Sequence, residues 1–283
     1  MAALPAPPRR LELVAAVPAS YLSTEHTLLL KTVKAGILAR LLAVFRVTRL
    51  IIYVDRAGVE RDAELLREIL EYIATAPYLR KLLYPLKPEL RYAGVLPPLQ
   101  LPTHGVGGPR AGEVREALVI RDLGDAVVLE AGLGRPVRCR KPGRLHSRRV
   151  LVEIISLEPP RIRILQPGEE RVYTGFTVKL ARGLRGALEA TRGLLRIATS
   201  RLGEAVTPEK LRRDSLEARA RGGVAVLLGA PDAGLHEMAR REGMVLEESV
   251  DRIYNTVPLQ GTRTVRVEEA LAATLSILNL FLE

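Results

Sequence analysis

Apolar runs of strand length alternate with helical segments at the start of the chain. Residues 11–17 and 50–54 are short, mostly aliphatic runs that predict buried strands. A helix is predicted between them, beginning at Ser23 or Thr24, and a second one over residues 62–75. The apolar residues of the first helix recur every four positions and predict one buried stripe: Leu29, Val33, Ile37, Leu41 and Phe45. Strand, helix, strand, helix in this order favours an α/β fold with a parallel sheet.

The helical periodicity stops between residues 92 and 172, where proline and glycine separate short runs typical of β-strands. These runs cover residues 117–120, 126–129, 150–155 and 161–165. They predict a small β-barrel, and the OB type is a common barrel for single-stranded nucleic acid. Tyr92 is the one aromatic residue in this region. We therefore expect its contribution to be phosphate contact more than base stacking.

The α/β pattern resumes after the barrel region, with apolar runs at residues 176–180, 194–199 and 224–228 and a helical segment around 187–192. The sequence thus predicts two domains. Residues 1–91 and 173–283 form one α/β domain, and residues 92–172 form an OB-like insert.

Two of the later strands end in residues suited to a ligand. The run 194–199 ends in the hydroxyls of Thr199 and Ser200, which either contact a ligand or bond to their own turn. The run 224–228 ends at Gly229, where the missing side chain lets the sugar of a ligand approach the backbone.

The tail Asn255–Ala270 joins a polar loop to a helix that runs to Leu280. Gly261 permits close approach of a ligand or a positive φ, and Thr262 or Thr264 is predicted to cap the helix. The segment is either part of a cofactor site or a capped helix after a tight turn.

These segments resemble the SPOUT class of RNA methyltransferases. Similar sequences occur at Lys34–Asp55, Val224–Ala239 and Asn255–Ala270. Shorter phrases resemble the archaeal and eukaryotic group of this class that carries a β-barrel insert, namely Ala76–Lys81, Ala93–Leu99 and Gln260–Thr262. The resemblance spans nearly the whole chain.

The resemblance implies a parallel sheet with a C-terminal trefoil knot, although true knots are rare. It implies S-adenosylmethionine as cofactor and a homodimer whose sites are completed across a two-fold interface. The strand-end loops would hold the cofactor through Thr199, Ser200, Leu228, Gly229, Gly234, Asn255, Val257, Pro258, Leu259, Gln260, Gly261, Thr262, Thr264 and Val265.

Arg40 matches the arginine of the first SPOUT motif and is the candidate catalytic residue, whereas Lys34 stands where the family often has asparagine. Methylation of uracil N3 would also need a proton acceptor. Glu268, Glu269 and Asp251 are candidates, and favourable interaction with a helix dipole explains the two glutamates equally well.

The net charge of +11 and the pI near 10.1 favour a polyanionic partner. Residues 135–149 contain no acidic residue and form either an RNA-binding surface or a solvated loop. The candidate RNA-binding residues are Arg135, Arg138, Arg140, Lys141, Arg144, Arg148 and Arg149.

Other function classes lack their sequence signals. No apolar stretch reaches the roughly 20 residues of a membrane helix, and the start lacks a signal-peptide core, so a cytoplasmic location is expected. Cys139 is the single cysteine and is predicted to pack as a small hydrophobe. The four histidines show no metal-ligand spacing, so no metal is expected.

The favoured function is S-adenosylmethionine-dependent methylation of a base in structured RNA, with rRNA and uridine N3 implied by the resemblance. The first alternative is a non-catalytic RNA-binding ribosome-assembly factor that retains the fold. The second is a translation-linked OB protein whose α/β domain is structural and binds no cofactor.

Overall fold

The computed structural model describes residues 6–282, and the chain divides into two compact units. The sheet unit comprises residues 9–71, 89–97 and 176–282, and the barrel unit comprises residues 6–8, 72–88 and 98–175. The predicted boundary after residue 91 lies inside the segment 89–97 of the sheet unit. Residues 72–88, predicted to belong to the α/β domain, cluster with the barrel.

The sheet unit contains a six-stranded sheet in which every pair of neighbouring strands is parallel. In spatial order the strands are β11 (Arg252–Asn255), β9 (Leu195–Ala205), β10 (Gly223–Leu227), β1 (Glu12–Pro18), β2 (Arg49–Val54) and β8 (Thr177–Arg182). Val14 and Ala15 point to opposite faces of β1, and both are fully buried. Both faces of the sheet are therefore covered, and the predicted α/β fold with a parallel sheet is confirmed.

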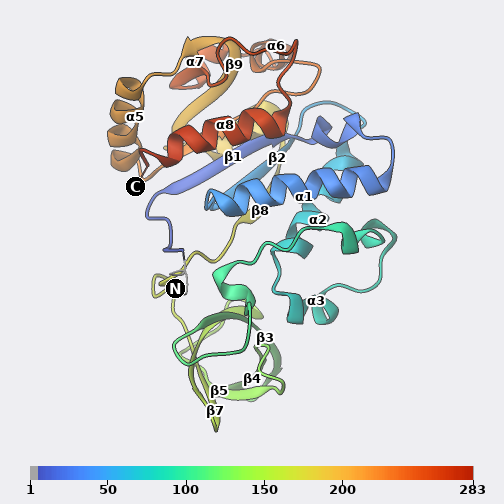
Figure 1. Cartoon of the computed structure of the whole chain (residues 1–283), viewed down its shortest axis with the longest axis vertical. Helices are drawn as coiled ribbons and strands as arrows, with labels where there is room; N and C mark the ends of the chain where they lie inside the picture. Colours follow the sequence, from blue (N-terminus) through green and yellow to red (C-terminus); the bar gives the residue numbers. More distant parts are fainter. Residues whose placement is uncertain (1–5, 283) are drawn as a thin grey trace. The chain divides into compact units, whose positions relative to one another are not determined.

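Helices cover the two faces of this sheet. They are α1 (Leu28–Val44), α2 (Glu60–Ala74), α4 (Gly183–Ala190), α5 (Pro208–Ala220), α6 (Leu235–Arg241), α7 (Leu246–Ser249) and α8 (Val267–Asn279), with short 3-10 turns η1 (Ala19–Thr24) and η3 (Ala93–Val95). On one face, Leu188 of α4, Met238 of α6 and Leu246 of α7 share a core with Ala16 and Leu227. Figure 1 shows α1 and α8 side by side in front of the sheet, and the two helices are in contact.

The helix α1 begins later than predicted. The 3-10 turn η1 occupies Ala19–Thr24, and the helix starts at Leu28. Thr27 is its N-cap, because the Thr27 hydroxyl oxygen accepts a hydrogen bond of 3.2 Å from the Leu30 amide.

The prediction of the buried face of α1 is wrong. Leu29, Val33 and Ile37 are 39 to 45% exposed, whereas the opposite face is buried through Ala35, Leu38, Ala39 and Leu42. The helix is apolar on two sides, so the four-residue spacing alone did not identify the side that packs on the sheet.

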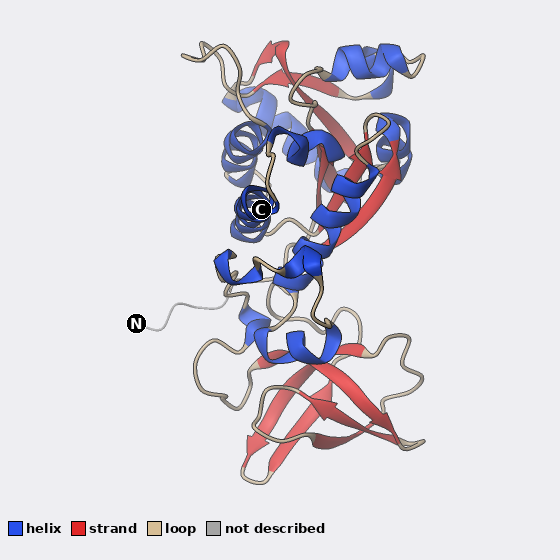
Figure 2. Cartoon of the chain, turned by 90° about the vertical axis from the view of Figure 1, so that its right-hand side faces the viewer, coloured by secondary structure: helices blue, strands red, loops and turns tan. Residues whose placement is uncertain are grey.

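The barrel unit contains a five-stranded antiparallel sheet in the order β5-β4-β3-β6-β7. Its strands are β3 (Val114–Asp122), β4 (Ala126–Glu130), β5 (Val137–Arg140), β6 (Arg149–Leu157) and β7 (Pro160–Ile164). The edge strands β5 and β7 contact each other, so the sheet curves into a nearly closed barrel (Figure 2). The predicted small β-barrel is therefore present, and Val127, Leu129 and Ile154 fill its interior.

The strand β5 was not predicted, because it lies inside the basic run. Its signal is an alternation of two residues: Val137 and Cys139 are buried, whereas Arg138 and Arg140 are exposed. Cys139 is a buried free thiol, which confirms its predicted packing. The unit also includes α3 (Pro77–Leu83) and the turn η4 (Pro102–His104), and η2 (Pro88–Leu90) begins at its end.

Candidate functional site

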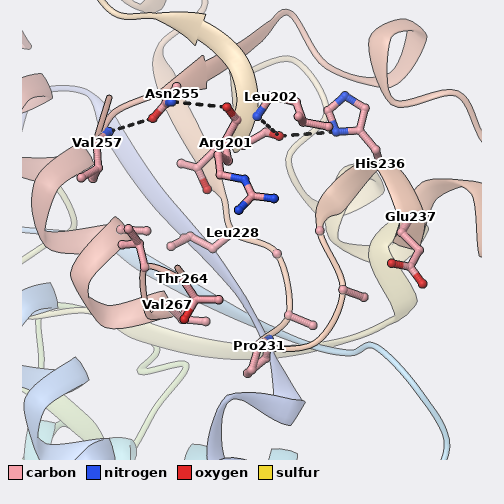
Figure 3. Close-up of a pocket in the computed structure, with 18 of the residues that line it drawn as sticks. Arg201, Leu202, Leu228, Pro231, His236, Glu237, Asn255, Val257, Thr264 and Val267 are labelled. Carbon is pink, nitrogen blue, oxygen red and sulfur yellow. Dashed lines mark hydrogen bonds between the residues drawn. The ribbon is translucent and has the colours of Figure 1, made fainter. Parts of the chain in front are cut away.

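A cavity of about 460 Å³ lies in the sheet unit, where the strands β9, β10 and β11 approach their carboxyl ends. Its lining comes from the middle of β9, the loop 228–234 after β10, the helix α6, the segment 254–265 that includes the end of β11, and the first turn of α8 (Figure 3). Ligands of open α/β sheets bind outside the carboxyl ends of the strands. The volume falls within the usual range for small-molecule sites, about 300–1,000 Å³.

Ten of the residues predicted to bind the cofactor line this cavity: Thr199, Ser200, Leu228, Gly229, Gly234, Asn255, Val257, Gln260, Thr264 and Val265. Four others, Pro258, Leu259, Gly261 and Thr262, lie in the same loop but outside the lining. Leu259 is fully exposed and has a φ of +54°, whereas Gly261 has no positive φ. Of the two roles predicted for Gly261, close approach of a ligand or a positive φ, the positive φ occurs at Leu259 instead.

Gly229 lies in a tightly packed turn of its own loop. The Leu228 amide donates to Ala16 O at 3.0 Å, which continues β10 to the cavity edge. The chain then turns back, and the Ala230 amide donates to Ala233 O at 2.8 Å. A Cβ atom on Gly229 would lie 3.2 Å from Ala233 O and from the Cα atom of Gly234. A larger residue would displace the loop that lines the cavity.

Asn255 joins two sides of the cavity. Its Oδ1 atom accepts from the Val257 amide at 3.1 Å, and its Nδ2 atom donates to Arg201 O at 3.3 Å (Figure 3). Gln260 Nε2 donates to Thr262 O at 2.8 Å and to Arg263 O at 3.2 Å. The Asn255 bond to Arg201 O ties the segment to β9, and the other bonds hold the segment 255–263 in its turn.

The predicted caps of α8 are wrong. The N-cap is Arg266, whose amide donates to Glu269 Oε2 at 2.8 Å. Thr262 Oγ1 donates instead to Thr264 O at 2.9 Å, within the loop. The threonines therefore shape the loop, and the glutamate stabilises the helix start.

A buried ionic group supports the strand β11 beside the cavity. The Tyr254 hydroxyl donates to Asp214 Oδ2 at 2.6 Å, and Arg252 Nε donates to Asp214 Oδ1 at 2.9 Å. Burial, together with the bond to Asp214, raises the pKa of Tyr254 to about 12. The phenol therefore stays protonated at neutral pH and acts as a structural donor.

Several charged cavity residues were not identified from the sequence: Arg201, Asp232, His236, Glu237, Arg240 and Arg263. The Arg201 guanidinium points into the space between Leu228 and the loop after β11 (Figure 3), and its Nη1 atom donates to Arg263 O at 3.3 Å. The sequence signal that could have identified these residues was their position in polar segments next to the predicted strands.

Two of the three candidate general bases have structural partners. Asp251 Oδ2 accepts from the Arg196 amide at 2.8 Å, and Asp251 Oδ1 accepts from Arg221 Nη1 at 2.9 Å. Glu269 caps α8. Glu268 has one buried carboxylate oxygen without a hydrogen-bond partner, but it does not line the cavity.

Arg40 is half-buried on α1 and does not line the cavity of its own chain. One turn earlier, Gly36 packs against the chain, since a Cβ atom there would lie 2.8 Å from Pro97 Cδ. Lys34 is buried with its Nζ atom 3.4 Å from Glu25 and 4.7 Å from the centre of the Tyr21 ring. Lys34 is therefore a structural residue.

The basic run of the barrel unit separates into two groups. Lys141 pairs with Asp122 at 2.8 Å, Arg149 pairs with Glu116, and Arg148 Nε donates to Val119 O at 3.2 Å. Arg135, Arg138, Arg140 and Arg144 are exposed and form no ion pair with any described residue. The second group is thus available for phosphate contacts.

Residues 6–282 contain neither a metal-binding cluster nor a membrane-spanning helix. No group of three or more His, Cys, Asp or Glu side chains is arranged to hold a metal ion. No described helix combines the length and the apolar character needed to cross a membrane.

The fold and this cavity define an α/β protein with a cavity beside the ends of its parallel strands. Residues 12–278 match the family described as "Putative RNA methyltransferase", and the chain belongs to this family. The protein is thus an RNA methyltransferase.

Proteins from archaea and animals are similar in sequence to this chain over most of their length. An uncharacterised protein of Halobacterium salinarum is 35% identical over 267 residues, which are 88% of this chain and 92% of that protein. The 28S rRNA (uridine-N(3))-methyltransferase of Homo sapiens is 26% identical over 299 residues, 93% of this chain and 77% of that protein. The enzyme of the same name from Drosophila melanogaster is 27% identical, over 93% of this chain and 61% of its own length.

Proposed function

We propose that the protein transfers the methyl group of S-adenosylmethionine to the N3 atom of a uridine in structured ribosomal RNA. The observation that carries this proposal is the cavity at the carboxyl ends of β9, β10 and β11, which brings together ten residues from three distant segments. The names of the human and fly relatives supply the nucleotide and the RNA class.

The chemistry of the cavity fits S-adenosylmethionine. Leu228, Val257 and Val265 provide apolar surface for an adenine ring. Acidic and basic side chains, among them Glu237 and Arg201, can pair with the amino and carboxylate groups of a methionine moiety. The sulfonium supplies the reactive methyl group, so the protein residues mainly have to orient the two substrates.

The finer assignment of the fold is part of the proposal. We propose a SPOUT-type knot formed by the segments around 229–234 and 255–265, and an OB type for the barrel. The placement of β11 beside β9, across β9 from β10, supports a crossing of the chain near the cavity. We assign methyl transfer to residues 1–91 and 173–283, and RNA binding to residues 92–172. The cytoplasmic location stays a prediction.

RNA affinity is expected to depend on the exposed arginines of the barrel unit. Replacing Arg138, Arg140 and Arg144 with alanine should reduce the slope of log affinity against log salt by about two to three, because each lost phosphate contact removes nearly one released counterion. Filter binding at several salt concentrations measures the slope. Arg163→Ala is the control, since Arg163 pairs with Glu153 and Glu169 in the same unit. An unchanged slope in the triple variant would place the RNA surface elsewhere.

A homodimer through α1 is the proposed assembly. Val33, Ile37 and Val44 are 39 to 57% exposed, and Arg40 lies on the same helix face because the spacings are four, three and four. An exposed apolar stripe of this kind marks an interaction surface. A second copy fits it, because a two-fold axis would place Arg40 of one subunit near the other subunit.

Ile37→Glu is expected to convert the dimer to a monomer without unfolding the chain, because the charge would be buried unpaired at the interface but solvated in the monomer. Sedimentation equilibrium measures the change. Leu216→Glu is the matched control, since Leu216 is a 68% exposed leucine on α5. A dimeric Ile37→Glu protein would remove α1 from the interface.

The rival function is an RNA-binding assembly factor without turnover. Mass mapping of ribosomal RNA from cells with and without the protein separates the two. Loss of one methyl group on a uridine supports the enzyme, and an unchanged map together with a defect in ribosome assembly supports the rival.

A further inference from the structure

Three polar side chains form a series of contacts at the rim of the cavity. Ser200 lies in β9, His236 in the first turn of α6, and Glu247 in α7. Ser200 Oγ is 3.5 Å from His236 Nδ1, and His236 Nε2 is 3.2 Å from Glu247 Oε1. Ser200 and His236 line the cavity, and Glu247 is not part of its lining. Bonds of catalytic groups are often long before substrate binds, so 3.5 Å is compatible with a working contact.

The hydrogen bonds of Ser200 leave its hydroxyl able to accept a proton from a ligand. A hydroxyl has one hydrogen and two lone pairs. The Leu202 amide donates to Ser200 Oγ at 3.1 Å and occupies one lone pair. When His236 Nδ1 is the acceptor, the Ser200 hydroxyl donates to it, and the second lone pair of the hydroxyl is left for a ligand in the cavity. Thr199 differs, because its hydroxyl donates to Leu227 O at 3.2 Å.

Glu247 determines which nitrogen of His236 carries the hydrogen. A carboxylate only accepts, so Nε2 donates to it and Nδ1 is the acceptor that faces Ser200. The Glu247 charge also stabilises the imidazolium that forms when Nδ1 takes up a proton, as a carboxylate does in a Ser-His-Asp triad.

We propose that Ser200, His236 and Glu247 form a proton relay that deprotonates the target base, which rests on the proposed methylation of uridine N3. The N3–H proton passes to Ser200 Oγ while the Ser200 proton passes to His236 Nδ1. The N3 electron pair forms the bond to the methyl carbon as the carbon–sulfur bond breaks, and the electron pair of that bond stays on sulfur. His236 ends as an imidazolium and returns the proton to water.

Of the charged groups near His236, Glu247 is the one that pairs with its imidazole ring. On α6, Glu237 pairs with Arg241, and Arg240 lines the cavity. Arg201 follows Ser200 on β9. Arg185 of α4 donates to Glu242 O at the far end of α6. Among the described residues, Glu247 is the carboxylate within ion-pair distance of the imidazole.

His236→Gln removes the acceptor nitrogen while keeping a polar side chain. Single-turnover transfer of labelled methyl to RNA should fall about 10²- to 10⁴-fold at neutral pH, the usual contribution of a general base. The transfer rate of the His236→Gln variant should rise with pH and approach that of the wild type, because the uracil ionises at high pH without a base. Ser200→Ala and Glu247→Gln should give smaller losses. Calorimetry gives the S-adenosylmethionine affinity of His236→Gln, so that the transfer rates are compared at saturating cofactor.

The tautomer of His236 is a readout that does not require turnover. Nitrogen-15 spectra of the histidine rings in the wild-type protein should show the Nε2–H form, and Glu247→Gln should produce a mixture of tautomers. The missing signal in His236→Gln assigns the resonance. His26→Gln and Glu248→Gln are the controls, because both residues are exposed and lie outside the cavity.

The outcomes separate the relay from the proposed function. A wild-type transfer rate in His236→Gln overturns the relay and leaves the function standing. A wild-type protein that binds S-adenosylmethionine but methylates no RNA contradicts the function. An Nδ1–H tautomer in the wild-type protein overturns the relay in either case.

Discussion

Gly229→Val is expected to abolish S-adenosylmethionine binding while the parallel sheet stays folded. The valine Cβ would lie 3.2 Å from Ala233 O and from Gly234 Cα, and its methyl groups would need further space in a loop that lines the cavity. The backbone at Gly229 has no positive φ, so the substitution causes no strain there and acts through this crowding alone. Affinity measured by calorimetry should fall at least about 100-fold, or ~2.7 kcal/mol.

Two further variants make the Gly229 result interpretable. Gly94→Val is the control, because no atom lies within 4 Å of its Cβ position and Gly94 is outside the cavity. Gly229→Ala adds one methyl group and should give a smaller loss of affinity, which keeps the test usable if the valine variant does not fold. A folded Gly229→Val protein with unchanged affinity would refute the assignment of this cavity.

Arg40→Lys is expected to keep the fold, the dimer and S-adenosylmethionine binding but to lose methyl transfer by about 10²- to 10³-fold, the usual effect of removing a donor that stabilises the transition state. A planar guanidinium can hold a phosphate or a carbonyl with two bonds, whereas lysine is a point charge. Single-turnover transfer to RNA measures the loss. Arg67→Lys on α2 is the control, since Arg67 is exposed and pairs with Glu64. A near-wild-type rate in Arg40→Lys would remove its catalytic role.

Mixing the two variants tests where Arg40 acts. In a mixed dimer of Arg40→Lys and Gly229→Val subunits, no subunit contains both an intact cavity and Arg40. If Arg40 acts across the interface, the intact cavity of the Arg40→Lys subunit is completed by Arg40 of the Gly229→Val subunit. Up to half of the sites in the mixed dimers then regain activity. If Arg40 acts within its own subunit, mixing restores nothing.

The fold was predictable where the hydrophobic pattern of an element points to one structure. The buried strands around Ala15 and Ile52 followed from short continuous aliphatic runs, the amphipathic helix α2 from its period, and the strands of the barrel from short β-type runs between turn residues. The helix α1 was misread because apolar residues lie on both of its sides. The strand β5 was missed because its outward residues are all arginines.

The site was predictable only in part, because its residues come from segments far apart in the sequence. The turn at Gly229 after β10 is visible in the sequence, and parallel strands bring their carboxyl ends to one edge. Ser200 was predicted at a strand end, but β9 continues past it to Ala205. The positive φ of Leu259 and the contact between His236 and Glu247 depend on how separate segments pack, which local spacing does not encode.

The position of Arg40 within the exposed apolar face of α1 has a kinetic consequence. If that face joins two subunits, dissociation separates Arg40 from the cavity it serves. Turnover per subunit would then fall on dilution below the dimer dissociation constant, and progress curves started from dilute enzyme would show a lag whose length shortens as protein concentration rises.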